Sequence, residues 1–196
     1  MVGKNSKNII LELYKNPRTV FRIMDIAMLL DIEKTESLRK ILNYYVKSGR
    51  LLNPRKGFYA KEDYKSEELA CLLYPPTYIS LEYVLQRAGI IFQYDSTITC
   101  ASYLTRELEI DKQSFSYRQI KGEILTNTTG IILNENNINI ATPERAFLDM
   151  LYLNKNFYFD NLHILDKKKV KYLLPVYNSQ TLEKRVTNLF ENDKYR

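Results

Sequence analysis

Apolar side chains recur with helical spacing in three stretches of the first sixty residues. The pattern predicts helices over residues 6–14, 22–30 and 34–48. Pro17 marks the end of the first helix, because the residue before a proline avoids helical backbone, and Gly49 ends the third. The positions of the third helix that follow the i, i+3, i+4, i+7 spacing of a buried face are Leu38, Ile41, Leu42 and Tyr45.

A hairpin pattern follows the third helix. Residues 50–53 and 58–60 are strand candidates on either side of the turn-forming sequence Pro54-Arg55-Lys56-Gly57. A further extended stretch, residues 19–21, precedes the second helix. Three helices followed by a basic hairpin are typical of a winged helix-turn-helix domain, and we expect such a domain over residues 1–62.

Helical and strand patterns mix in the rest of the chain. Ser80 and Thr142 are candidate N-caps, because a hydroxyl oxygen can accept a hydrogen bond from the first turn of a helix. The predicted fold class is therefore α+β, with a mixed α/β C-terminal domain over residues 63–196. Its other predicted helices cover residues 66–74, the basic run after Asp166, and residues 179–190; its predicted strands cover residues 98–102, 114–120, 130–133 and 138–141, the last two joined by the turn 134–137.

Positive charge is concentrated in the first domain. Residues 1–60 hold twelve Lys and Arg against five Asp and Glu, a net charge of +7, whereas the remaining residues hold seventeen against eighteen, a net charge of −1. This asymmetry favours a DNA-binding module joined to a nearly neutral domain.

Within a winged helix, the third helix enters the major groove and the hairpin contacts phosphate. Two simpler readings stay open: the charged residues form an ordinary solvated helix face, or the domain docks a protein. The basic hairpin and the net charge favour double-stranded DNA. We assign Arg39, Asn43 and Tyr44 to base edges or sugars and Lys40, Lys47, Arg55 and Lys56 to phosphates, with Thr35 on the same exposed surfaces of the helix.

Catalytic chemistry has little support in this sequence. His163 is the single histidine, and the glycines never cluster into a phosphate-binding loop. The alternative function is a metal-dependent nuclease, with an acid-x-Lys element at Asp63 and Lys65. That spacing is common by chance, so we expect a non-enzyme without cofactor or metal. Further carboxylates for the nuclease reading would come from Glu107, Glu109 and Asp111.

The two cysteines and the N-terminal residues indicate where in the cell the protein is expected. Cys71 and Cys100 have no CxxC spacing and are expected to be core thiols. The sequence has no run of eighteen apolar residues, and its start lacks the apolar stretch of a signal peptide. The expected location is the cytoplasm, without membrane contact.

Three parts of the chain resemble one bacterial family. These are the hairpin segments 48–51 and 57–60, the sequence Tyr78-Ile79-Ser80-Leu81-Glu82 followed by residues 88–91, and residues 140–149, Ile-Ala-Thr-Pro-Glu-Arg-Ala-Phe-Leu-Asp. Together they resemble the AbiE-type antitoxins, which are transcriptional regulators with an N-terminal winged helix, and the likeness extends from about residue 5 to residue 190. Where members often have Lys after the Pro-Glu pair, this chain has Arg145, which we expect on a helix surface.

The resemblance implies a role in a type IV toxin-antitoxin system. The winged helix would bind the operator of its own operon and repress it, as a monomer or homodimer. The second domain would contribute to repression and would counter a partner toxin similar to a nucleotidyltransferase. A further hypothesis makes the second domain a dimerisation element only, as a palindromic operator would favour.

Overall fold

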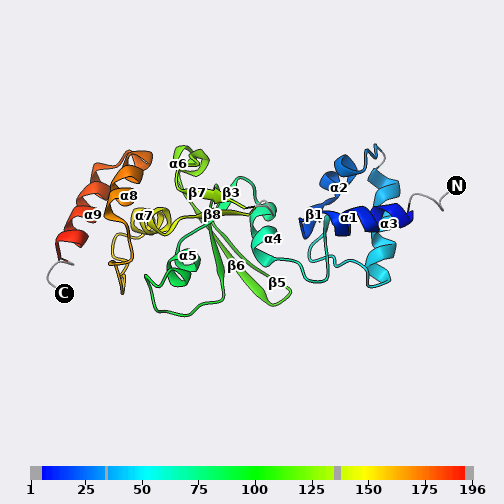
Figure 1. Ribbon diagram of the computed structural model, residues 1–196, viewed down its shortest axis with the longest axis horizontal. Coiled ribbons are helices and arrows are strands. Elements are labelled where there is room, and N and C mark those ends of the chain that lie inside the picture. The colour runs from blue at the N-terminus through cyan, green and yellow to red at the C-terminus, as the bar shows by residue number, and fades with distance from the viewer. Residues whose placement is uncertain (1–5, 34, 135–137, 193–196) are drawn as a thin grey trace. The chain divides into compact units, whose positions relative to one another are not determined.

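The computed structural model describes residues 6–33, 35–134 and 138–192, which form two compact units. The first unit extends to Leu72 and the second begins at Leu73 (Figure 1). The elements of the first unit are α1 (Ser6–Lys15), β1 (Val20–Arg22), α2 (Ile23–Leu29), α3 (Thr35–Lys47), β2 (Phe58–Ala60) and α4 (Ser66–Leu73), whose last residue lies past the division.

The three predicted N-terminal helices are confirmed, and they enclose one apolar core. Its buried side chains include Leu13 from α1, Ile26 from α2, Leu38 and Leu42 from α3, and Tyr59 from β2. The periodicity of the third helix therefore identified its buried face correctly, with Ile41 only partly buried.

The predicted hairpin is only partly formed. Of the stretch 50–53, Leu52 alone bridges β2, through two backbone hydrogen bonds with Ala60 at 2.8 and 3.0 Å. The main partner of β2 is β1, which pairs antiparallel with Val20 opposite Ala60. Pro54 has no N–H to continue a ladder, and the Asn53 side chain satisfies carbonyls across the turn instead. The result is a small sheet in which β2 lies between β1 and Leu52.

The first unit extends to Leu72, beyond the predicted domain boundary at residue 62. Residues 61–68 are held to Thr19 at the start of β1. The backbone N–H of Lys61 donates to the Thr19 carbonyl at 2.9 Å, and that of Lys65 donates to Thr19 Oγ1 at 2.9 Å. Residues 61–65 are thus attached to the first unit, and α4 follows them from Ser66, where a helix was predicted.

The second unit is built on a mixed six-stranded sheet. Its strand order is β5-β6-β4-β3-β8-β7; β4 is parallel to β6, β3 is parallel to β8, and the other neighbours are antiparallel. The four strands predicted from the sequence are confirmed, whereas β3 and β5 were not predicted. The strands are β3 (Thr77–Ile79), β4 (Ile98–Ser102), β5 (Arg106–Ile110), β6 (Gln113–Gln119), β7 (Ile131–Leu133) and β8 (Asn139–Ala141). The tip of the predicted turn 134–137 lies outside the described residues.

Helix α7 (Pro143–Leu153) is central to the second unit: it contacts β8, α5 (Glu82–Arg87), α8 (Lys167–Leu173) and α9 (Gln180–Asn192) (Figure 1). The predicted Thr142 cap is confirmed, because its side chain accepts from the backbone N–H of Arg145. The short helix α6 (Gly122–Thr126) and the 3-10 turn η1 (Leu174–Tyr177) complete the unit.

The predicted Ser80 cap is wrong. Tyr78 and Ile79 belong to strand β3, and Leu81, at φ 61°, is the N-cap residue of α5. The Ser80 hydroxyl instead donates to Asp149 Oδ2 at 2.8 Å inside the core. A buried carboxylate offers a hydroxyl a stronger bond than a helix end does, and tertiary structure overrides the local signal here.

The expected surface position of Arg145 is also wrong, because its side chain is completely buried. Its Nε lies 3.3 Å from Asp149 Oδ1, one turn further along α7. Its remaining donors reach the Tyr78 hydroxyl at 3.1 Å and the carbonyls of Ile124 and Thr129 at 2.7 and 3.0 Å. Arg145 therefore joins α7 to β3 and to the segment around α6.

Cys71 and Cys100 are buried free thiols, as predicted. In the described part of the chain, no helix is long and apolar enough to cross a membrane.

Candidate nucleic-acid interface

One face of α3 carries most of the predicted DNA-contacting residues. Leu38, Leu42 and Tyr45 point into the core of the first unit, and the side chains on the remaining surfaces face solvent. Residues four apart on a helix lie on the same side, which gives one row from Arg39 through Asn43 to Lys47 and a second from Lys40 to Tyr44. Arg39, Lys40, Asn43, Tyr44 and Lys47 are exposed, and Thr35 is half-buried at the first residue of the helix.

The turn before β2 holds the other two predicted residues. The N–H of Phe58 donates to the Arg55 carbonyl at 2.9 Å, closing a four-residue turn, and Gly57 occupies its third position at φ +87°, as a type II turn requires. The Asn53 amide donates to the carbonyls of Arg55 and Phe58 at 3.0 and 2.6 Å. Lys56 is exposed at the second position of this braced turn, and Arg55 is half-buried.

The turn is also tied to the start of α2. The N–H of Ile23 donates to the Gly57 carbonyl at 3.1 Å. The turn therefore has a defined position relative to the helices of the first unit, rather than projecting as a free loop.

Tyr59 connects the small sheet to α3 directly. Its side chain is buried, with 3% exposed, and its hydroxyl donates to Asn43 Oδ1 at 3.4 Å. Burial raises the pKa of Tyr59 above its ordinary value of about 10, while the nearby positive charge of Arg39 opposes the rise. The hydroxyl therefore stays protonated at neutral pH. Sequence reasoning missed this residue: the alternation of residues 58–60 indicates that its ring points inward, but gives no sign of the contact with Asn43.

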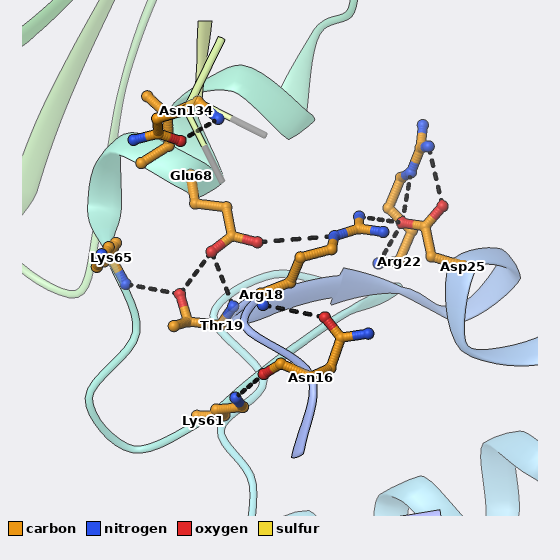
Figure 2. A network of polar contacts seen from close by, with 10 residues as sticks. Asn16, Arg18, Thr19, Arg22, Asp25, Lys61, Lys65, Glu68 and Asn134 are labelled. Carbon is orange, nitrogen blue, oxygen red and sulfur yellow. Dashed lines mark hydrogen bonds and ion pairs between the residues drawn. The ribbon is translucent and has the colours of Figure 1, made fainter. Parts of the chain in front are cut away.

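Several cations of the first domain serve structure instead. Figure 2 shows Arg22 against Asp25, and Arg18 between Asp25 and Glu68. Arg22 Nη2 lies 3.0 Å from Asp25 Oδ1, and the contacts of Arg18 with Asp25 and Glu68 are 3.4 and 3.8 Å long. Lys61 is buried and donates from Nζ to the Asn16 carbonyl at 2.6 Å. Because Arg18 and Arg22 are among the twelve basic residues of positions 1–60, that count overstates the charge that can face a ligand.

The Asp25 carboxylate is the centre of this ion-pair group. Burial alone would raise its pKa, but hydrogen bonds from the Arg22 side chain and backbone, together with the Arg22 and Arg18 charges, outweigh burial and lower it. Asp25 also accepts from the backbone N–H of Arg22 at 3.0 Å and so caps α2. The group fixes the start of α2, which also holds the turn at Gly57.

The carboxylates of the nuclease alternative are divided between the two units. Asp63 and Lys65 lie in the first unit, and Glu107 and Glu109 lie on β5 in the second. Both of these glutamates line a cavity of about 580 Å³, together with Glu82, Asp95 and Arg118. In the described residues, no group of three or more His, Cys, Asp or Glu side chains is placed to hold a metal ion.

Comparison with known proteins supplies a fold and no family. No family model matches the sequence, and no curated protein matches it. Among solved structures, the chain is similar to the RV2827C protein from Mycobacterium tuberculosis, with a TM-score of 0.55 and 12% sequence identity over 97% of this chain and 78% of that one. At this identity the likeness shows a shared α+β fold alone.

Proposed function

We propose that this protein binds double-stranded DNA in a sequence-dependent manner and represses transcription of its own operon. The first unit acts as a winged helix-turn-helix module, with α3 as the recognition helix and the turn at Lys56 as the tip of the wing. The observation that carries the proposal is the solvent-exposed basic face of α3, backed by an apolar core and by a braced basic turn in the same unit.

The exposed residues divide into two roles. Arg39 and Asn43 have the donor groups that major-groove base edges accept, and Tyr44, with 61% of its surface exposed, offers a ring and a hydroxyl beside them. The cations of α3 and of the turn provide charge against phosphate, which positions the protein without reading sequence. The phosphate group comprises Lys40, Lys47, Arg55 and Lys56, with Thr35 at the start of the helix as an additional polar contact.

The antitoxin role rests on the family resemblance. On that basis the second unit counters a partner toxin similar to a nucleotidyltransferase, encoded with this protein. The protein is then both regulator and antitoxin of a type IV system, and it works without cofactor or metal.

The test is fluorescence-anisotropy binding of the full chain to the DNA upstream of its own gene and to scrambled DNA of equal length, across a series of salt concentrations. Specific binding should be at least a thousandfold tighter than binding to scrambled DNA and should weaken steeply with salt. Equal, weak binding to both DNAs would reject the repressor function.

A further inference from the structure

Asn43 differs from the other exposed residues of α3 because a buried side chain holds its carbonyl oxygen. The partner is the Tyr59 hydroxyl, 3.4 Å from Asn43 Oδ1, and the Tyr59 ring is packed in the core of the first unit. A buried ring cannot follow a moving surface amide, so its hydroxyl provides a fixed reference point for the Asn43 side chain.

The charge around Tyr59 sets the direction of this bond. Arg39 lies one turn before Asn43 on the same side of α3, and its guanidinium charge acts on the Tyr59 oxygen. A positive group near the phenol oxygen favours an arrangement with the lone pairs toward Arg39 and the hydrogen toward Asn43. The hydroxyl then donates, and the oxygen of the Asn43 amide is the group that accepts.

An asparagine held in this way presents its NH2 donors to a base more readily than its oxygen. A free asparagine recognises adenine with two bonds, since its oxygen accepts from N6 and its NH2 group donates to N7. The Tyr59 hydroxyl takes one of the two lone pairs of Oδ1 and holds that oxygen toward the buried ring, so the NH2 group is the part of the amide that is left to face a base and donate. Guanine presents N7 and O6 as acceptors in the major groove and thymine presents O4, whereas cytosine presents only its N4 donor.

We propose that Tyr59 is a positioning residue that sets the base preference of Asn43, directing it to guanine or thymine, and against cytosine, at one operator position. The inference rests on the proposed function and deepens it. It assigns specificity to a side chain that is itself too buried to touch DNA.

The experiment measures binding of the full chain to four operators that differ only in the base pair at one position. That position is identified as the one where Asn43→Ala removes the base preference. The wild-type protein should bind the guanine or thymine operator at least about fivefold more tightly than the cytosine operator, the lower end expected for a base contact. Tyr59→Phe frees Asn43 Oδ1, so adenine should gain about fivefold relative to guanine and thymine.

Two further variants keep the result interpretable. Tyr14→Phe removes a hydroxyl from the same unit, where it donates to the Arg50 carbonyl at 3.0 Å, and it should leave base preference unchanged. Asn43→Asp leaves Tyr59 in place and presents only acceptors, so the preference should turn toward cytosine, whose N4 group donates. This second reversal tests the inference even if Tyr59→Phe impairs folding, which thermal melting of each variant would reveal.

The outcomes separate the inference from the function on which it rests. If the wild-type protein does not distinguish operator from scrambled DNA, the proposed function fails. If it does, but Asn43→Ala alters preference at no position, Asn43 reads no base and the inference is overturned. If Asn43→Ala abolishes a preference that folded Tyr59→Phe and Asn43→Asp both retain, the positioning role of Tyr59 is overturned while repression stands.

Discussion

Glu68 Oε2 accepts two hydrogen bonds from Thr19, one from the backbone N–H at 2.8 Å and one from the hydroxyl at 2.7 Å. The Glu68 side chain has no exposed surface, and its other oxygen, Oε1, lies 3.8 Å from Arg18 Nε (Figure 2). The pair attaches α4 to the first residues before β1. Helix α4, which was predicted as the first helix of the second domain, thereby becomes part of the first unit up to Leu72.

Replacing Glu68 with Ala should destabilise the first unit by about 3 kcal/mol, because it leaves the Thr19 N–H and hydroxyl without their buried acceptor and removes one of the two carboxylates beside Arg18. The measurement is urea unfolding of the full chain followed by circular dichroism. Glu62→Ala removes an exposed carboxylate from the same segment and should leave the midpoint within error. Equal midpoints for the two variants would show that Glu68 does not hold α4 in place.

Much of this architecture was predictable because its signals are local. The spacing of Leu38, Leu42 and Tyr45 defines a helix face, and Thr142-Pro143 starts α7 through bonds made within one turn. Strand β5 was not predicted, because its sequence Arg-Glu-Leu-Glu-Ile is largely exposed on an edge of the sheet and reads as a charged stretch. Its strand structure depends on pairing with β6, and no local sequence pattern predicts that pairing.

The burial of Arg145 could not be predicted for a related reason. Beside a proline and a glutamate at a helix start, an arginine reads as a surface residue, since isolated charges are rarely buried. Its place in the core depends on Asp149 and on partners from β3 and the segment around α6, which lie 16 to 67 residues away in sequence. Tyr177 completes the group by donating to Asp149 Oδ1 at 2.6 Å.

Asp149→Asn should therefore destabilise the second unit by about 3 to 5 kcal/mol, because it leaves the Arg145 charge buried without its counter-charge. The double variant Arg145→Met with Asp149→Leu should lose less than the sum of the two single changes, because no charge then remains in the core. Chemical unfolding of Arg145→Met, Asp149→Leu and the double variant gives the coupling energy, and Asp149→Asn is measured alongside them, with Glu123→Gln on the exposed start of α6 as the control. Strict additivity would mean that the two charges do not depend on each other.

The candidate interface was predictable only as a set of residue types. Helical periodicity placed Arg39, Asn43 and Lys47 on exposed positions, and composition supplied their charge. The tertiary structure decides which of these cations form ion pairs within the protein. Arg22 and Lys47 look alike in the sequence, yet Arg22 is paired with Asp25. The same holds for the bond between Tyr59 and Asn43, which joins residues sixteen positions apart.

The stabilising contribution of Asp25 to the first unit should be lost at acidic pH. Its folded-state pKa is lowered, so its carboxylate stabilises the fold above the unfolded value of about 3.9, and this contribution is lost as the pH falls through the folded pKa. Asp25→Asn should thus lower the melting temperature at pH 7, and the difference from the wild type should shrink progressively as the pH falls below about 3.9. A wild-type advantage that persisted undiminished at the lowest pH would show that the charge of Asp25 is not its source.

The cations assigned to phosphate should each contribute to the salt dependence of DNA binding. Lys40→Ala, Lys47→Ala and Lys56→Ala should weaken binding to operator and scrambled DNA alike, and each should reduce the slope of log K against log salt by about 0.9, the value for one neutralised phosphate. Lys155→Ala, at an exposed position of the second unit, is the control and should leave the slope unchanged. If all four variants reduced the slope equally, the effect would reflect overall charge and not contact by α3 and the turn. An unchanged slope for Lys56→Ala alone would show that the turn does not contact the phosphate backbone.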